Sequence, residues 1–276
     1  MNNYLLSAAI GDIAGSAYEG RSHRTKDYNA VKMFSSRAHF TDDTVCTFAC
    51  AEAFIKGKNM ADNLWMCANQ YPDAGFGKRF KEWMKSHDHL PYGSVGNGSA
   101  MRCSSAGWLA QSEEECIKLA TLTAEPTHNH PEGIKGAVAT ALAIFYLKTG
   151  HDKEYIRQFV LDKYYPYWSN KSYQDIHDDY TFNSTCPGTI GPAIISFIAS
   201  KDYIDCLRLA ISLGGDSDTL AAIACPMAYA YYKEMPAPIV YKALKMLPDW
   251  MRRVSQEFDD FVNEKCTIKL PTTLYE

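Results

Sequence analysis

Apolar stripes at helical spacing run through much of this chain of 276 residues. Within residues 134–145, 203–211 and 220–231, apolar side chains recur every three or four positions, as on one face of a helix. Runs of alternating apolar and polar residues, which are typical of strands, are hard to find. No linker-like stretch, low-complexity segment or solenoid repeat divides the chain. We therefore predict an all-α fold in which residues 1–276 form one compact multi-helix domain.

Composition and charge exclude several classes of protein. Hydrophobic residues make up 46% of the chain and charged residues 22%, as in an ordinary globular protein with a sizeable core. The net charge of −4 argues against a broad binding surface for nucleic acid or an anionic membrane. The N-terminus lacks the basic region of a secretory signal, and the longest uncharged stretch, residues 180–200, is too broken by Pro and Gly to span a bilayer.

The nine cysteines indicate a reducing compartment. Their number is odd, no Cys-x-x-Cys occurs, and most lie within apolar helical patterns. Such usage is typical of thiols packed in a core rather than of a disulfide framework or a zinc knuckle. We therefore expect a cytoplasmic protein, and we expect it to be a monomer.

Two acid-rich turns lie far apart in the sequence, and each leads directly into an apolar helical run. They are Thr41-Asp42-Asp43-Thr44 and Gly214-Gly215-Asp216-Ser217-Asp218-Thr219. Either turn alone could be an ordinary helix cap, because helix N-termini favour acidic residues. If the two turns meet, several carboxylates share one site, which is costly unless a cation lies between them. Oxygen ligands of this kind suit Mg²⁺, Mn²⁺ or Ca²⁺ better than zinc.

The first apolar stripe, in residues 5–19, is interrupted by two acids. Asp12 lies in the middle of the stripe and Glu19 at its end, while Gly11 and Gly15 would let a neighbouring helix approach closely. A buried acid needs a partner, so we predict that the Asp12 carboxylate binds main-chain N–H groups of a loop. For Glu19, a catalytic or metal-binding role and a solvated helix end both remain open.

Two further segments carry polar chemistry. Residues 93–98 contain three glycines, which would let the backbone approach an anion, although a flexible turn has the same composition. The segment is not a Walker loop, because no Gly-Lys-Ser/Thr follows. The histidines of Thr127-His128-Asn129-His130-Pro131 are two positions apart, so they do not share a helical face as in a helical zinc site. Taken alone, they are more typical of loop histidines than of ligands.

Together these segments resemble the ADP-ribosylglycohydrolase family, in the family's order and spacing and over nearly the whole chain. The matching motifs are Gly11-Asp12-Ile13-Ala14-Gly15 through Glu19, Thr41-Asp42-Asp43, Gly96-Asn97-Gly98-Ser99-Ala100-Met101-Arg102, Thr127-His128, and Gly214-Gly215-Asp216-Ser217-Asp218-Thr219. The segments Tyr71-Pro72-Asp73-Ala74-Gly75-Phe76-Gly77 and His130-Pro131-Glu132-Gly133-Ile134-Lys135-Gly136 are similar to a bacterial branch of the family. The resemblance implies the family's compact all-α fold.

The resemblance also implies a site with two divalent cations, Mg²⁺ or Mn²⁺, at the base of a cleft. The implied metal ligands are Thr41, Asp42, Asp43, Asp216, Asp218 and Thr219. The implied catalytic residues are Glu19, Asp42, Asp43 and Asp218. The implied contacts to ADP-ribose are Gly75, Phe76 and Gly77 at the distal ribose, Gly93, Ser94, Val95, Gly96, Asn97 and Gly98 at the diphosphate, and His128. Val95 stands where some relatives carry an aromatic that stacks on adenine, so a stacking ring would have to come from Tyr92 or from Tyr164, Tyr165 or Tyr167.

The chemistry of such a site is consistent with hydrolysis at a ribosyl carbon. Cleavage of a ribosyl C1 bond develops positive charge on the sugar, and two cations can hold its vicinal hydroxyls and lower the pKa of water. We therefore predict a metal-dependent hydrolase that releases ADP-ribose from an ADP-ribosylated protein or a small adduct. The alternatives are a hydrolase of a free ADP-ribose derivative or another N-riboside, and a non-catalytic ADP-ribose-binding or structural member of the family.

Overall fold

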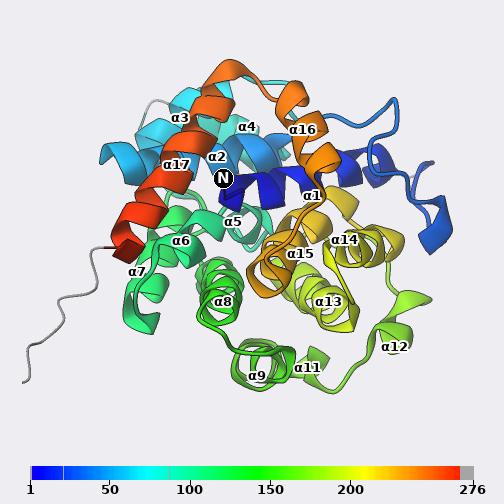
Figure 1. The fold of residues 1–276 in the computed structure, drawn as a ribbon. Coiled ribbons are helices and arrows are strands. Elements are labelled where there is room, and N and C mark those ends of the chain that lie inside the picture. The colour runs from blue at the N-terminus through cyan, green and yellow to red at the C-terminus, as the bar shows by residue number, and fades with distance from the viewer. Residues whose placement is uncertain (1, 21, 87, 268–276) are drawn as a thin grey trace, which may run out of the picture.

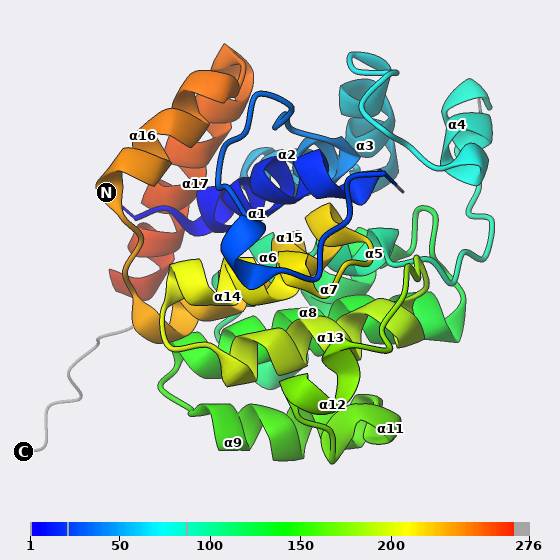
Figure 2. The same cartoon turned by 90° about the vertical axis from the view of Figure 1, so that its right-hand side faces the viewer.

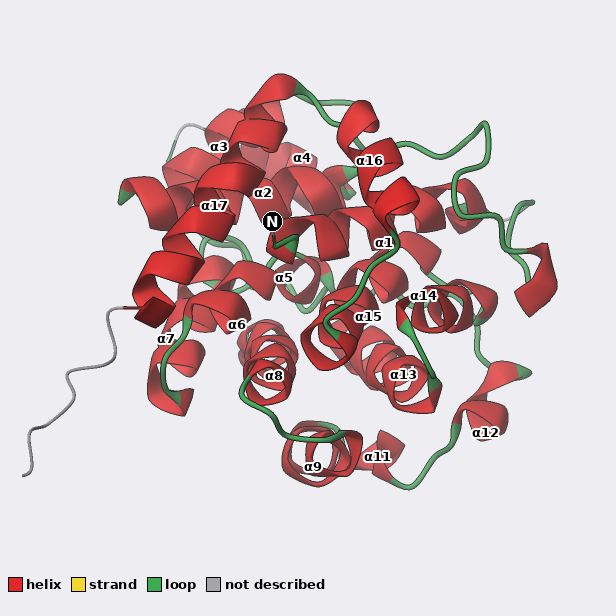
Figure 3. Ribbon diagram, in the orientation of Figure 1, coloured by secondary structure: helices red, strands yellow, loops and turns green. Residues whose placement is uncertain are grey.

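The computed structural model describes residues 2–20, 22–86 and 88–267, and within these ranges the chain is helical without any strand. Figure 3 shows helices joined by loops throughout. An isolated antiparallel bridge joins Gly96 to Thr185. The predicted all-α class is therefore confirmed. The assignment of residues 1–276 to one domain stays a prediction, although the described helices pack around one continuous hydrophobic core.

The helices differ widely in length. The long ones are α1 (Tyr4–Glu19), α2 (Asp42–Lys56), α3 (Met60–Asn69), α7 (Glu113–Ala124), α8 (Pro131–Lys148), α13 (Cys186–Ala199), α14 (Tyr203–Ser212), α15 (Ser217–Tyr232), α16 (Ala237–Met246) and α17 (Asp249–Thr267). The short ones are α4 (Lys78–Lys85), α5 (Gly98–Met101), α6 (Ser104–Leu109), α9 (Lys153–Ile156), α10 (Asp162–Tyr164), α11 (Pro166–Ser169) and α12 (Tyr173–His177). A 3₁₀ turn, η1 (Tyr28–Ala30), and a π-helical turn, η2 (Arg157–Leu161), complete the described elements.

Helix α1 crosses the middle of the molecule, with α2 on one side of it and α15 on the other (Figures 1 and 2). The crossing with α15 depends on two glycines of α1. A Cβ atom on Gly11 would lie 2.4 Å from the main-chain oxygen of Ala221, and one on Gly15 would lie 2.5 Å from the Cα of Asp218. The predicted close approach of a helix to Gly11 and Gly15 is therefore confirmed, and it joins α1 directly to the start of α15.

The three predicted stripes all lie in helices, namely α8, α14 and α15. Helices α8 and α15 are buried on nearly every side, so each lies inside the molecule rather than on its surface. In Figure 1, α8, α13, α14 and α15 are seen nearly end-on below α1. Because α15 lies inside the molecule, the polar residues of its first turn lie inside the molecule as well.

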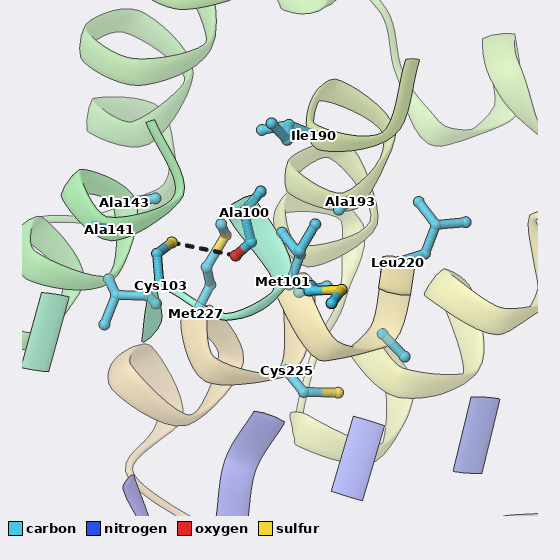
Figure 4. Packing of buried hydrophobic residues seen from close by; sticks show 14 of the residues in the cluster. Ala100, Met101, Cys103, Ala141, Ala143, Ile190, Ala193, Leu220, Cys225 and Met227 are labelled. Carbon is cyan, nitrogen blue, oxygen red and sulfur yellow. Dashed lines mark hydrogen bonds between the residues drawn. The ribbon is translucent and has the colours of Figure 1, made fainter. Parts of the chain in front are cut away.

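The short helix α5 carries the end of the glycine-rich segment into the core. Figure 4 shows Ala100 and Met101 of α5 among buried side chains of α8, α13 and α15. The thiol of Cys103 donates to the carbonyl oxygen of Ala100 at 3.2 Å. This packing fixes the C-terminal end of the segment, which otherwise has the composition of a flexible turn.

The eight cysteines whose side chains are described are buried and free, in keeping with the prediction of core thiols. The side chain of the ninth, Cys266, lies outside the described part of the chain. Among the described helices, none combines the length and the apolar character that crossing a membrane would require.

Candidate active site

The two acid-rich turns meet at the N-terminal ends of α2 and α15. Thr41 is the N-cap of α2, and its hydroxyl oxygen accepts from the N–H of Asp43 at 3.2 Å. Asp216 precedes α15, and the Thr219 hydroxyl of α15 donates to Asp43 Oδ2 at 3.3 Å. Residues 176 positions apart thus share one hydrogen bond. The close packing of α1 on α15 brings the two turns to opposite sides of one small polar volume.

Asp12 anchors one of these turns, as predicted. Its Oδ2 accepts from the N–H of Thr41 at 2.8 Å and from the N–H of Thr44 at 3.1 Å. Its carboxylate also accepts from both threonine hydroxyls, at 2.7 Å from Thr41. The carboxylate is fully buried and its bonding is nearly saturated. Asp12 therefore fixes the start of α2 from the adjacent helix α1.

Several acids of this site lack compensating charge. Asp43 Oδ1 is buried and has no hydrogen-bond partner among the described residues. Carboxylate oxygens of Asp12, Asp43 and Asp218 lie within 4.8 Å of one another, and so do those of Glu19, Asp216 and Asp218. Such an orphaned oxygen beside crowded carboxylates fits the requirements of hard divalent cations, which take oxygen ligands. Asp218 belongs to both groups, so it could bridge two ions.

The crowding of these acids also shifts their pKa values. Burial, followed by the charge of Asp12, raises the pKa of Asp42 to about 8. Burial raises the pKa of Asp216 to about 6, and the hydrogen bond from Asn97 opposes the shift. Burial, with neighbouring carboxylates, raises the pKa values of Asp43 and Asp218 well above their usual range. A bound cation would favour the charged forms and reverse these shifts.

A cleft of about 430 Å³ opens above the acids. Most of the predicted site residues line it, and they come from α1, α2, α5, α15 and the intervening loops. These residues are Glu19, Asp42, Asp43, Gly75, Gly77, Ser94, Gly96, Asn97, Gly98, His128, Asp216, Asp218 and Thr219. The structure therefore brings both acid-rich turns, the glycine-rich segment and His128 to one cleft.

Four predicted residues do not line this cleft. Thr41 is buried beside Asp12. Phe76 is also buried and stacks on Phe80, with ring centroids 4.9 Å apart. Gly93 donates its N–H to the Asn129 side chain, and Val95 is exposed. These four residues could therefore take part in metal or ADP-ribose binding only through contacts outside the lining of this cleft.

Four of the six N–H groups of residues 93–98 are already used inside the protein. The donors Gly93, Ser94, Gly96 and Asn97 bind, in that order, Asn129 Oδ1 (2.8 Å), Thr127 O (3.2 Å), Ser94 Oγ (3.1 Å) and Ser184 O (2.9 Å). Only Val95 and Gly98 could then offer a main-chain N–H to an anion. The main chain of this loop therefore offers an anion at most two donors.

His128 lies directly against the glycine-rich segment. A Cβ atom on Gly98 would lie 3.2 Å from His128 Nε2. Burial, together with the positive charges of Arg102 and Arg79, holds the pKa of His128 well below its usual range. The histidine is therefore neutral at physiological pH. The other predicted histidine of this segment, His130, caps α8 by accepting from the N–H of Glu132.

The candidate stacking rings have separate locations. Tyr92 lines the cleft, and the Arg79 guanidinium lies 4.7 Å above its ring. Tyr165 is buried and Tyr167 is exposed, and neither of them nor Tyr164 lines the cleft. Tyr92 is therefore the one of these four tyrosines with access to a ligand in this cleft.

No role in the site was predicted for several other residues of the cleft wall, which are Lys78, Arg79, Phe80, Met101, Arg102, Phe182 and Ser184. Lys78 and Arg79 directly follow Gly75–Gly77, so a basic pair after a glycine turn was an available signal. Phe182 and Ser184 carried none. Their segment reaches the cleft because Thr185 pairs with Gly96.

The fold and the site together define a helical protein whose cleft carries crowded carboxylates of the kind that bind divalent cations. A sequence model of the family described as ADP-ribosylglycohydrolase matches residues 3–267, and the chain belongs to this family. Human ADP-ribosylhydrolase ARH3 is 28% identical, over 83% of this chain and 84% of that protein. The Xenopus tropicalis ADP-ribosylhydrolase ARH3 is 23% identical, over 91% of this chain and 93% of that protein.

A solved structure shares the fold. It is titled an ADP-ribosylglycohydrolase-related protein complex, and it matches with a TM-score of 0.73 and 20% sequence identity. The match covers 94% of this chain and 96% of that one. The predicted family and its compact all-α fold are therefore confirmed.

Proposed function

We propose that this protein is a divalent-cation-dependent hydrolase that cleaves the ribosyl C1 bond of an ADP-ribosylated protein or small adduct and releases ADP-ribose. The observation that carries the proposal is the convergence of crowded carboxylates at one end of a cleft and a glycine-rich wall with a neutral histidine at the other. Family membership supports the same chemistry. The intact acids count against a non-catalytic role, because a member without catalysis would have no need to keep this electrostatic cost.

The acidic end is the proposed cation site. Asp43, Asp216, Asp218 and Thr219 face it from the two turns, and Asp42 borders it at the mouth of the cleft. Thr41 contributes a hydroxyl oxygen next to Asp12. Mg²⁺ or Mn²⁺ bound there would supply positive charge to the ribose hydroxyls and lower the pKa of water. The roles of the chain itself are to hold these oxygens in place and to exclude bulk water from them.

Glu19 is the proposed general base. It lies at the end of α1, is exposed, and lines the cleft beside Asp216 and Asp218. Its carboxylate is therefore free to accept a proton from the attacking water. Asp42, Asp43 and Asp218 are proposed to act in catalysis by fixing the cations.

The remaining wall is proposed to hold the rest of ADP-ribose. Gly75 and Gly77 border the cleft next to Asp42, where a ribose could approach without meeting a side chain. Ser94, Gly96, Asn97, Gly98 and His128 form the proposed diphosphate site, and Tyr92 offers a ring to adenine. Phe76, Gly93 and Val95 would then act by supporting the backbone of these segments rather than by contact.

A substrate panel tests this function. Purified protein with Mg²⁺ or Mn²⁺ is offered arginine-, serine-, aspartate/glutamate- and nucleobase-linked ADP-ribose, and free ADP-ribose is measured by chromatography. Release from at least one linkage supports the proposal and identifies the acceptor. Cleavage of a free ADP-ribose derivative alone would favour the alternative enzyme, and binding without release from any substrate would contradict hydrolysis.

We also propose a setting for the reaction. The eight buried free thiols support a reducing compartment such as the cytoplasm. A monomer, and the absence of a nucleic-acid partner, stay predictions from the composition.

A further inference from the structure

A fully buried arginine borders the cleft without a carboxylate partner among the described residues. Arg102 Nε donates to the carbonyl oxygen of Thr123 at 2.9 Å, and Nη2 donates to that of Ala124 at 3.3 Å. These carbonyls end helix α7, where the helix dipole favours positive charge. Nη2 also donates to Thr127 Oγ1 at 2.8 Å. The side chain therefore does more than cap a helix, since its third bond leads toward the cleft.

The Thr127 hydroxyl connects this arginine to His128. Thr127 Oγ1 lies 2.7 Å from His128 Nδ1. A guanidinium has only donors, so Thr127 must accept from Arg102 and keeps its own proton for another acceptor. The neutral hydroxyl of Tyr92, which also faces Thr127, could accept this proton as well, but the short contact of Thr127 Oγ1 is the one to His128 Nδ1. In the arrangement proposed here the Thr127 proton is donated to Nδ1 of His128.

We propose that Arg102, acting through Thr127, is a positioning residue that fixes His128 as the neutral tautomer with hydrogen on Nε2. Both ring orientation and proton location are then set before any ligand binds. His128 Nε2 faces Gly98, and a Cβ atom on Gly96 would lie 3.6 Å from it. The fixed N–H therefore points at the glycine-rich wall of the cleft.

This donor supplies what the glycine-rich segment lacks. Four of its six N–H groups are engaged internally, so the main chain alone offers little to a diphosphate. A neutral imidazole with hydrogen on Nε2 can donate a hydrogen bond to an anion without first having to take up a proton. This inference rests on the proposed function in one respect only, which is that the ligand at this wall is the diphosphate of ADP-ribose.

Tautomer measurement on the free protein tests the inference directly. In two-bond ¹H–¹⁵N correlation spectra of protein labelled at histidine, the His128 signals are identified by their loss in His128→Asn. The expected result is one neutral tautomer with hydrogen on Nε2 between about pH 5 and 8, the range over which an ordinary histidine titrates. Hydrogen on Nδ1, or titration like that of an exposed histidine, would overturn the proposal.

Variants separate the positioning role from a structural one. Thr127→Val should give mixed His128 tautomers and raise the Kd of ADP-ribose roughly 3- to 10-fold, the worth of one ordinary hydrogen bond. Thr127→Ser should restore both, and Thr121→Val, at a half-buried position of α7 where the hydroxyl donates to the carbonyl oxygen of Ile117, should change neither. An unchanged tautomer and Kd in folded Thr127→Val would also overturn the proposal. Because the spectra need neither cation nor substrate, absence of hydrolysis would contradict the proposed function and leave this result standing.

Discussion

Glu19 is the predicted site acid with an exposed carboxylate, whereas Asp43, Asp216 and Asp218 are buried. Its position at the end of α1 followed from helical spacing, but its contact with the cleft did not. That contact depends on α15, which begins almost two hundred residues later. From its spacing in the sequence alone, Glu19 could equally be a solvated acid at a helix end or a catalytic acid.

Glu19→Gln keeps the size of the side chain and removes its basicity. We expect turnover to fall roughly 10²–10⁴-fold, which is the usual contribution of general acid–base catalysis. The Kd of ADP-ribose should change little, because a group that acts only in the transition state does not contribute to ground-state binding. Steady-state kinetics and calorimetry on the variant measure both quantities. Glu114→Gln, on the exposed face of α7, is the matched control, and near-normal turnover in Glu19→Gln would remove Glu19 as the base.

Asp43→Asn tests the cost of the crowded acids. The variant should bind Mn²⁺ more weakly, while its metal-free form should lose less stability than a core truncation such as Leu142→Ala, for which about 2–5 kcal/mol is expected. Loss of one carboxylate relieves repulsion from its neighbours. Metal titration calorimetry and urea unfolding check the two parts. Unchanged Mn²⁺ affinity would exclude Asp43 as a ligand.

At the scale of the helices, packing between elements brings the site residues together. The N-cap chemistry of α2 and the small residues of α1 could both be read from the sequence, because each depends on neighbours along the chain. The glycine-rich segment was harder to interpret. Three of its N–H groups bind Thr127, Asn129 and Ser184, which lie outside the segment, and a fourth binds Ser94, so a composition typical of an anion cradle concealed how few donors remain.

Gly15→Ala tests the contact between α1 and α15. The added Cβ would lie 2.5 Å from the Cα of Asp218, so α15 must shift. We expect a loss of about 1–3 kcal/mol in the free energy of unfolding, as for overpacked cores, together with weaker Mn²⁺ binding. Gly20→Ala is the matched control, since its Cβ would meet no atom within 4 Å. Equal stability of the two variants would contradict the close packing described here.

Asp259 of α17 provides a pH-dependent link to α1, away from the cations. Its Oδ1 accepts from the N–H of Tyr4 at 3.2 Å, and burial raises its pKa to about 7. A raised carboxyl pKa means that stability present below about pH 4 is lost as the pH rises through 7. Asp259→Asn should therefore stabilise the protein more, relative to wild type, at pH 8 than at pH 5.

Urea unfolding at the two pH values measures this difference in the free energy of unfolding. The contribution of the cleft acids is the same in the variant and in wild type, so it cancels in the comparison. Asp162→Asn serves as the control, because it removes an exposed acid of α10 that is not among the charges acting on Asp259. The same stability difference for Asp259→Asn at both pH values would show that Asp259 does not titrate in this range.

At the scale of the whole molecule, helical periodicity and five ordered motifs predicted the fold class and the family. The cleft wall could be predicted only in part. Phe182 reaches it through packing between elements distant in sequence, which no local pattern encodes, whereas Lys78, Arg79 and Arg102 closely follow glycine-rich segments. The acids of the two turns were recognisable because each lies at a helix start, where local chemistry and function place the same residue type.

The account depends most on cations at the acidic end of the cleft. The direct measurement is release of ADP-ribose from the best substrate of the linkage panel, first in excess chelator and then during back-titration with Mn²⁺ or Mg²⁺. We expect no release above background in chelator and recovery that saturates as the cation is restored. Full release of ADP-ribose in excess chelator would contradict the account.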